Sequence, residues 1–553
     1  MRAGILSNGK GMREKIPNGI MANRYKKADS KKKETGWILH KLLREITATY
    51  VFLMLVIYPL YYQNKYYNMG DAKWQFFSVV TFIAGGILLA VFLCYLAELL
   101  RKQELQGYIQ KIQLSVLDKF VLAYMAAVLI SVLLSPYKDQ IIWGYDGWYM
   151  GLIAQTCFVL IYFFVSRYWR WDRSAIIIYL VSAFFVFFIA VLMRFMIDPL
   201  EMYKDLDEQY IINFLTTIGQ ATWYSSYMVI LFPLGMFAFW HYDNKYARIF
   251  SGIFTAVGFM TMVTQNSDSA FIAFAVLFFA LFWLSMESNK RFERFLEVVI
   301  MCLACFKFMG ICQIAFPERA VQLDSLPTFC SQSNLIWILL VIVLVFYFCF
   351  RQMEKNEAMD VSKVKFIRVI LLAAVLVAAA AVVAYIYLNT TGKLPANMRS
   401  DNNYLLFDEY WGNNRGSSWM IAVKSFMEGS PVRKLFGCGP DGFSPFVYSF
   451  FGEELAAKWG QNTVLTCAHN EWMNALVNLG IVGAAAYIGI FVSAARRFLQ
   501  KSEENPELIA VALSILCYMG HNFFCYQQII CTPTIFILIG AAEAIIRYGK
   551  VRE

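Results

Sequence analysis

Apolar stretches of about 20 residues recur along almost the whole chain, and short polar segments separate them. A helix of that length crosses the hydrocarbon core of a bilayer. The pattern predicts fourteen spans, with centres near residues 54, 86, 126, 158, 184, 231, 257, 278, 305, 342, 378, 483, 516 and 537. We therefore expect an all-α fold, a polytopic transmembrane helical bundle of about 12–14 spans.

One polar segment, residues 389–468, is far longer than the others. Loops of this length in a compact fold usually carry function. Inside it, apolar residues recur at helical spacing from Trp419 to Phe426, and Ser417 is suited to cap the start. We expect a short helix there that ends at Gly429, with Arg415 just before its first turn.

This interruption divides the chain into four parts. They are a basic N-terminal segment, a transmembrane bundle, a large extracytoplasmic loop with short helices, and C-terminal transmembrane helices, at residues 1–45, 46–388, 389–468 and 469–553. Hydrophobic residues make up 59% of the chain and charged residues 16%, whereas soluble domains are about 45–50% apolar and about 25% charged. The composition therefore favours one integral membrane protein over a string of soluble domains.

Positive charge is distributed unevenly in the sequence. Residues 1–45 contain twelve Lys or Arg against four acids, and no cleavage site for a signal peptide follows them. Most other basic residues fall in short segments that the fourteen-span pattern places on the same side: 101–119, 167–173, 287–294, 351–368, 496–501 and 547–552. Because basic loops stay inside the cell, we expect both termini in the cytoplasm and the long loop outside. The basic terminus is expected to face anionic membrane lipid and not nucleic acid.

His469 is one of only four histidines, and it lies where the long loop meets the span near residue 483. A helix N-terminus favours the neutral imidazole, which a general base requires. The alternative is a boundary histidine that bonds a headgroup or a loop. Asn470 is expected to orient a hydroxyl or the imidazole, or to cap the helix. Gly480 and Gly483, about three turns later, favour close helix approach.

Arg415 is the second candidate, because a guanidinium pairs well with phosphate oxygens. Arg399 and Lys434 add positive charge in the same loop, although for each of these cations taken singly an ordinary charged surface is the favoured interpretation. Gly437 and Gly439 belong to a turn that either is simply tight or offers its amides to an anion.

Two further segments between spans combine polar and aromatic residues, at 143–149 and 219–224, and the second contains Gln220. Such rings stack on sugars or form the aromatic belt of a membrane protein. Asp268 lies in a polar turn, where it is able to hold a cation, pair with Arg415 or remain solvated. The sequence has no phosphate-binding loop and no clustered metal ligands. We therefore expect neither a metal nor another cofactor. Whether Cys438 and Cys467 form a disulfide stays open.

The combination resembles the O-antigen ligase and O-antigen polymerase superfamily. The resemblance covers about residues 413–496 and rests on His469-Asn470, nine residues, then Gly480-Ile481-Val482-Gly483, on Arg415 with Trp419, and on the turn Leu435 to Phe443. It implies a bacterial inner-membrane glycosyltransferase that moves a glycan from undecaprenyl diphosphate to a glycan, lipid or protein acceptor at the outer face.

In that family the loop histidine acts as base or orients the acceptor, and arginines bind the diphosphate. These roles fall on His469 and Arg415, with Asn470, Arg399, Lys434, Asp268, Gln220 and Trp419 as candidate substrate-binding residues. The chain departs from the family at Asp268, where many members have arginine, so a second phosphate contact has to come from elsewhere, such as Arg399 or Lys434. Ligase and polymerase remain open alternatives. A polysaccharide transporter or flippase is less favoured, because the spans contain few charges apart from Arg194 and Lys307.

Overall fold

The computed structural model describes residues 36–110, 112–460 and 463–549, so most of the predicted basic segment 1–45 lies outside the described residues. The chain forms two compact units. One combines the residues up to 46 with residues 85–113, and the other contains residues 47–84 and everything from 114 onward. The second unit contains all the candidate site residues, and the following description concerns that unit unless a helix runs through both.

A helix lies at each of the fourteen predicted centres, which confirms the all-α polytopic fold. The helices are Gly36–Leu60, α2 Met69–Arg101, α4 Val116–Leu134, α6 Leu152–Tyr168, α7 Arg173–Met193, α9 Ala221–His241, α10 Lys245–Thr264, α11 Asp268–Ser285, α12 Asn289–Ala315, α14 Asn334–Lys355, α15 Ile367–Thr390, α19 Glu471–Gln500, α20 Leu508–His521 and α21 Thr532–Tyr548. Eleven of these described helices are long and apolar enough to cross a membrane, whereas α6, α20 and α21 have 17, 14 and 17 residues.

Short elements connect the long helices. They are α3 Leu105–Gln110, α5 Lys138–Ile141, α8 Glu208–Ile211, α13 Ser325–Gln332, α16 Trp411–Glu428, α17 Pro431–Phe436, α18 Phe443–Trp459, and single turns at Val361–Val364 and Ala396–Met398. The first helix, Gly36–Leu60, ends in a π-helical turn at Leu53–Ile57 and a 3-10 turn at Tyr58–Leu60. Two strands, β1 Phe214–Leu215 and β2 Gly219–Gln220, pair antiparallel, with Phe214 opposite Gln220. This hairpin leads directly into α9.

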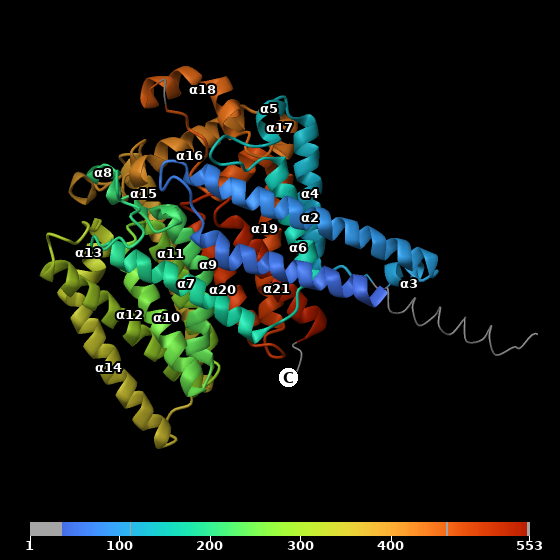
Figure 1. The fold of residues 1–553 in the computed structure, drawn as a ribbon. Helices are drawn as coiled ribbons and strands as arrows, with labels where there is room; N and C mark the ends of the chain where they lie inside the picture. The colour runs from blue at the N-terminus through green and yellow to red at the C-terminus, as the bar shows by residue number, and fades with distance from the viewer. Residues whose placement is uncertain (1–35, 111, 461–462, 550–553) are drawn as a thin grey trace, which may run out of the picture. The chain divides into compact units, whose positions relative to one another are not determined.

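The bundle core is aromatic and tightly packed. Helix α9 lies against α10, α11 and α20, while α19 packs on α4 and α21 on α6 (Figure 1). The ring of Phe232 contacts Phe259 and Phe274 at centroid separations of 5.0 and 4.9 Å. A Cβ at Gly258 would lie 2.3 Å from the Phe232 ring, so α9 and α10 approach as closely as they do because residue 258 has no side chain.

The helices give the bundle two ends. At one end α9, α11 and α19 begin, and the residues of 391–470 connect there; we name this the loop end. At the opposite end, buried Asp118 pairs with Arg167 and Arg547, and buried Glu543 pairs with Arg497 and Arg547. Each buried acid in this cluster thus has an arginine partner, as a low-dielectric interior requires.

Arg194 and Lys307, the charged residues noted within predicted spans, donate hydrogen bonds to backbone carbonyl groups at the ends of helices and connecting segments. Arg194 is fully buried and donates hydrogen bonds to the carbonyl oxygens of Ile211, Ile212 and Gln265. Lys307 donates to Gln332 O and Ser333 O, where α13 meets α14. These carbonyl groups lie outside regular helical hydrogen bonding, and the two side chains supply their donors. Arg194 and Lys307 therefore hold connecting segments in place.

Candidate active site

A cavity of about 720 Å³ lies at the loop end, between the starts of α9, α11 and α19 and the long loop. Its lining combines residues from segments far apart in the sequence: Ile212, Asn213, Gln220–Thr222, Asn266–Asp268, Asp324, Ser325, Asn403, Tyr404, Asn414, Arg415, Ser418, Trp459, Thr463–Thr466, His469, Phe524 and Tyr526. Four residues singled out from the sequence, His469, Arg415, Asp268 and Gln220, therefore line one cavity.

The backbone at His469 has a φ of +53°, a left-handed conformation that is uncommon for a residue with a side chain. This turn brings Nδ1 within 3.3 Å of the carbonyl oxygen of Cys467, and the ring edge packs on Tyr526 with centroids 5.2 Å apart. Because a carbonyl only accepts, the contact assigns the proton to Nδ1. The lone pair of Nε2 is then free to act as a base.

The pKa of His469 is lowered to about 4. Burial has the largest effect, the positive charge of Arg415 adds to it, and the bond to the Cys467 carbonyl opposes both. The imidazole is therefore neutral at physiological pH, which is the protonation state that a general base needs.

Asn470 caps α19. Its Oδ1 accepts hydrogen bonds from the backbone N–H groups of Trp472 and Met473 at 3.0 and 3.1 Å. The side chain is buried and does not contribute to the cavity lining. Of the two roles expected for Asn470, the geometry corresponds to the cap.

Arg415 lies in α16, which begins at Trp411, six residues before the expected cap Ser417. The first turn is irregular, because Gly412 and Asn414 both have positive φ, and Ser417 N donates to Glu409 O. The helix extends toward Trp411 because the Trp411 ring packs on Trp419, at a centroid separation of 5.0 Å. The expected start at Ser417 was therefore wrong, whereas the end at Gly429 is confirmed.

The Arg415 guanidinium is the one Lys or Arg group in the described lining of the cavity. Nη1 donates to Gly412 O at 2.9 Å, and the group lies over the Phe524 ring at 5.8 Å. Nε is buried and has no hydrogen-bond partner among the described residues. A fixed guanidinium in the cavity lining is suited to pair with an anionic oxygen of a ligand.

Two carboxylates line the same cavity. Asp268 accepts a hydrogen bond from Tyr404 OH at 2.6 Å and forms no ion pair with Arg415 within the described residues. Burial, and secondly Asp268, raises the pKa of Tyr404 to about 12. Burial raises the pKa of Asp324 as well, and the nearby Asp268 adds to that effect. The cavity thus combines one fixed cation with an acidic wall.

The aromatic segments at 143–149 and 219–224 pack on each other next to this site. The ring of Trp148 makes edge contacts with Trp223 and Tyr526, at 5.8 and 5.0 Å between centroids. Neither tryptophan is among the lining residues of the 720 Å³ cavity, whereas Gln220, at the end of β2, is. These aromatics therefore support Tyr526, which in turn supports the His469 ring.

Three other candidates lie outside the cavity lining. Trp419 packs behind Arg415 against Phe524, with ring centroids 5.8 Å apart. Arg399 donates to the carbonyl oxygens of Gly392 and Leu394, so its guanidinium is engaged locally. Lys434 lies on α17, which packs against α19. A direct role in substrate binding stays a prediction for all three.

The glycine turn and the glycines of α19 form one structure. Gly480 has a φ of +67° and interrupts the helix, which leaves the carbonyl oxygens of Val477 and Asn478 without their helical donors. The amides of Cys438 and Gly439 donate to these two oxygens at 3.2 and 2.8 Å. The turn had been a candidate anion site, but the amides of Cys438 and Gly439 are used in hydrogen bonds to α19.

Close approach requires glycine on both sides of this contact. A Cβ on Gly480 would lie 2.3 Å from the backbone of Leu435, and a Cβ on Gly437 would lie 2.2 Å from Asn478 O. At Gly483 the added Cβ would meet Leu479 of its own helix at 2.4 Å and Ala127 of α4 at 3.6 Å. Cys438 is buried in the contact, and all twelve cysteines, which lie within the described residues, are free.

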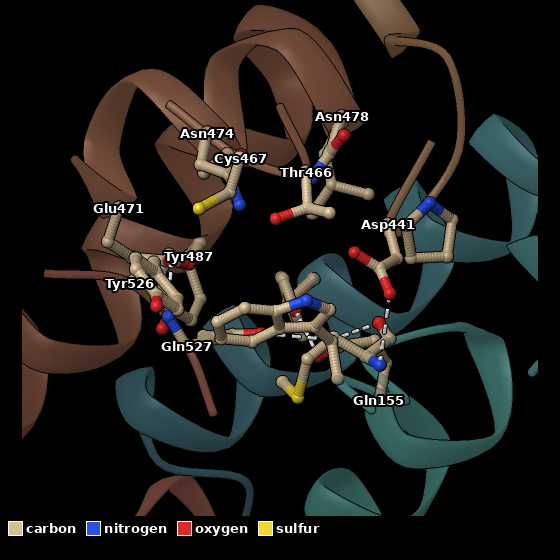
Figure 2. A pocket seen from close by; sticks show the side chains of 16 residues that line it. Gln155, Asp441, Thr466, Cys467, Glu471, Asn474, Asn478, Tyr487, Tyr526 and Gln527 are labelled. Carbon is tan, nitrogen blue, oxygen red and sulfur yellow. Dashed lines mark hydrogen bonds between the residues drawn. The ribbon is translucent and has the colours of Figure 1, made fainter. Parts of the chain in front are cut away.

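A second, much smaller cavity of about 30 Å³ lies beside the first and shares Thr466 and Tyr526 with it (Figure 2). Polar side chains point into it, among them Asp441, Glu471, Asn474 and Gln155. A polar space of this size has room for a water molecule or two.

The two carboxylates of the small cavity fix the segments that surround the site. Asp441 Oδ2 accepts from the amides of Tyr145 and Met150, at 2.7 and 3.2 Å, and Glu471 Oε2 accepts from Gln527 N at 2.7 Å. Burial raises the pKa of Asp441 to about 6, and the two amide bonds oppose that shift. The sequence did not single out Asp441 or Glu471. The only signal for them was their position, Asp441 in the glycine turn and Glu471 directly after His469-Asn470.

A comparison with family models found a match over part of the chain. Residues 320–488 match the family model described as O-Antigen ligase, and the match includes Arg415, the glycine turn, His469 and Gly480. The match supports the resemblance to the O-antigen ligase and polymerase superfamily. A comparison with curated proteins found no match. The chain is thus an O-antigen ligase- or polymerase-like, multi-pass membrane protein.

Proposed function

We propose that the protein is a membrane glycosyltransferase that transfers a glycan from an undecaprenyl-diphosphate-linked donor to an acceptor hydroxyl at the outer face of the cell membrane. The observation that carries this proposal is the meeting of His469 and Arg415 in one cavity at the loop end. A neutral base and a fixed cation are the two groups that such a displacement needs when no metal takes part.

In the proposed reaction, His469 Nε2 accepts the proton of the acceptor hydroxyl as its oxygen attacks the anomeric carbon of the donor. The bond between that carbon and the diphosphate oxygen breaks, and the electron pair leaves with the diphosphate. Arg415 stabilises the negative charge that develops on the leaving group. A single displacement inverts the configuration at the anomeric carbon. The proton on His469 passes to solvent or to the released diphosphate.

The acceptor distinguishes a ligase from a polymerase, and the chemistry at His469 and Arg415 serves both. A growing glycan as acceptor makes the protein a polymerase, and a lipid or protein acceptor makes it a ligase. Asp268 and Asp324 are suited to accept hydrogen bonds from sugar hydroxyls on the acidic wall of the cavity.

The test is transfer activity of the purified full-length protein with lipid-linked donor. His469→Ala is expected to lower the rate by about 10²–10⁴-fold, the usual contribution of a general base. Lys424→Gln, a change on the solvent-exposed face of α16 where Lys424 pairs with Glu454, is the matched control and should retain the rate. Full activity of a folded His469→Ala protein would refute the assignment.

A further inference from the structure

A second large cavity, of about 690 Å³, lies at the end of the bundle opposite the loop end. It is formed where α6 and α9 end and α7, α10 and α20 begin, with the last turns of α21 behind it. Helix α9 spans 21 residues between the two cavities, which is about 30 Å at 1.5 Å per residue. This cavity therefore has no part in the chemistry proposed for His469.

Small side chains create the space. Five alanines line it, Ala238, Ala247, Ala510, Ala541 and Ala542. Its inner wall is buried, with Phe237 at 2% and Leu180 at 8% exposure, whereas Ile177 and Tyr246 on the α7 and α10 side are 44% and 80% exposed. The cavity therefore opens toward the surface that faces the surrounding lipid. Apolar cavities of this kind do not hold water, but an alkyl chain fits them.

The rim of the cavity has the composition of a membrane–water interface. Trp169, Trp171, Tyr242 and Tyr246 surround it, as aromatic residues do at headgroup depth. The one acid in the described lining, Glu507, accepts a hydrogen bond from Tyr242 OH at 2.8 Å.

The cations of the rim lack acidic partners. Arg173 lines the cavity, and Lys245 follows the lining residue Asn244. Neither forms an ion pair with the described residues, and both are exposed. The acids nearest to them in sequence are engaged elsewhere. Asp172 accepts hydrogen bonds from the amides of Ser174 and Ala175, and Asp243 pairs with Lys290 and Arg294. The rim thus offers two free cations at headgroup depth, directly above an apolar space.

We propose that this cavity binds an anionic phospholipid of the surrounding membrane, with one acyl chain between α7, α10 and α21 and its phosphate at Arg173 and Lys245. Basic pockets between membrane helices bind anionic headgroups in this way. A neutral zwitterionic lipid fills the same apolar space but gains less from the two cations. The bound lipid replaces packing that the five alanines leave out, so it stabilises this end of the bundle.

The test uses the full-length protein in detergent, titrated with phosphatidylglycerol or with phosphatidylcholine of the same acyl chains. Native mass spectrometry counts the retained lipids, and the thermal midpoint reports stabilisation. We expect phosphatidylglycerol to bind preferentially and to raise the midpoint. Arg173→Gln should weaken phosphatidylglycerol about fivefold, as expected for one cation near a lipid surface. Arg496→Gln, an exposed arginine at the same end of α19, should leave its affinity unchanged.

A second variant tests the alkyl space. Ala541→Phe places a ring in the cavity and is expected to abolish retention of the lipid, while Ala485→Phe, the same change on an exposed face of α19, retains it. Equal binding of both lipids, unchanged binding in both cavity variants, or preferential retention of a polyprenyl phosphate would overturn the proposal. The experiment measures lipid binding and thermal stability of the purified variants. Its outcome therefore does not depend on whether the protein has transfer activity.

Discussion

At the scale of single residues, the proposed reaction requires a neutral His469 and a charged Arg415 in the same cavity. The first condition follows from burial and from the proximity of the second residue, since both lower the pKa of the imidazole. The charge of Arg415 therefore helps to keep the imidazole of His469 neutral. This coupling leads to two predictions.

The first concerns pH. The pKa of an unperturbed histidine is about 6.5, whereas the pKa of His469 is lowered to about 4. A lowered pKa keeps the imidazole neutral as the pH falls, so the acid limb of the kcat/KM profile is expected near pH 4. The same shift means that the unfolded chain binds the proton more readily between pH 6.5 and 4. The free energy of unfolding is therefore expected to decrease as the pH falls from about 6.5 to about 4. A limb near pH 6.5 that His469→Gln removes would contradict the prediction.

The second concerns the shape of the cation. Arg415→Gln removes the charge and is expected to lower kcat about 10²–10³-fold, the usual effect of losing one donor to a developing negative charge. Arg415→Lys keeps the charge but lacks the planar fork and the contact with Phe524, so it should fall between Gln and the parent. Steady-state kinetics of the two variants, with Lys424→Gln alongside, measures the order. Equal loss in both would mean that geometry, and not charge, decides.

At the scale of elements, the kink of α19 at Gly480 holds the glycine turn in place. Helix existence was predictable, because an apolar run of 20 residues is a local property, and a helix lies at every predicted centre. The partner of the kink was not predictable, since Val477 and Cys438 lie 39 positions apart and only the fold brings them together. The same applies to Phe524 and Tyr526, whose segment between α20 and α21 contains no recognisable motif.

The kink carries a stability prediction. Gly480→Ala forces a left-handed residue and pushes a Cβ to within 2.3 Å of the Leu435 backbone, so we expect at least about 2 kcal/mol of destabilisation, more than the left-handed penalty alone. Gly85→Ala, in a membrane helix where a Cβ meets nothing within 4 Å, should be neutral or stabilising by up to about 1 kcal/mol. Thermal or denaturant unfolding in the same detergent compares the two. A Gly480→Ala protein as stable as Gly85→Ala would contradict the packing argument.

At the scale of the whole molecule, the two ends of the bundle differ in chemistry. Both carry buried charge, but at the loop end Arg194 satisfies carbonyl groups while at the opposite end arginines pair with Asp118 and Glu543. The distribution of Lys and Arg predicts that the loop end faces outward. This orientation is a prediction from the sequence alone, because charge placement can be analysed without knowing which helices are in contact.

The orientation is testable by labelling. In a background with the exposed cysteines Cys94 and Cys349 replaced by serine, Tyr410→Cys on the long loop is expected to react with a membrane-impermeant maleimide in intact cells. Lys363→Cys, between α14 and α15, should react only after permeabilisation. Both positions are exposed, so access and not burial decides. The background protein without added cysteine gives the baseline, and the reverse pattern would invert the topology.

The bond between the glycine turn and α19 also has a consequence for biosynthesis. The turn precedes α19 in the chain, yet the carbonyl oxygens that accept from Cys438 and Gly439 exist only after that helix has formed. Likewise, Phe524 and Tyr526 of the cavity are translated after the loop that they support. The nascent loop thus emerges from the ribosome without the partners that shape it, and the cavity at the loop end is complete only after those partners have been made. A polypeptide arrested anywhere before α20 would be inserted in the membrane but would have no finished site.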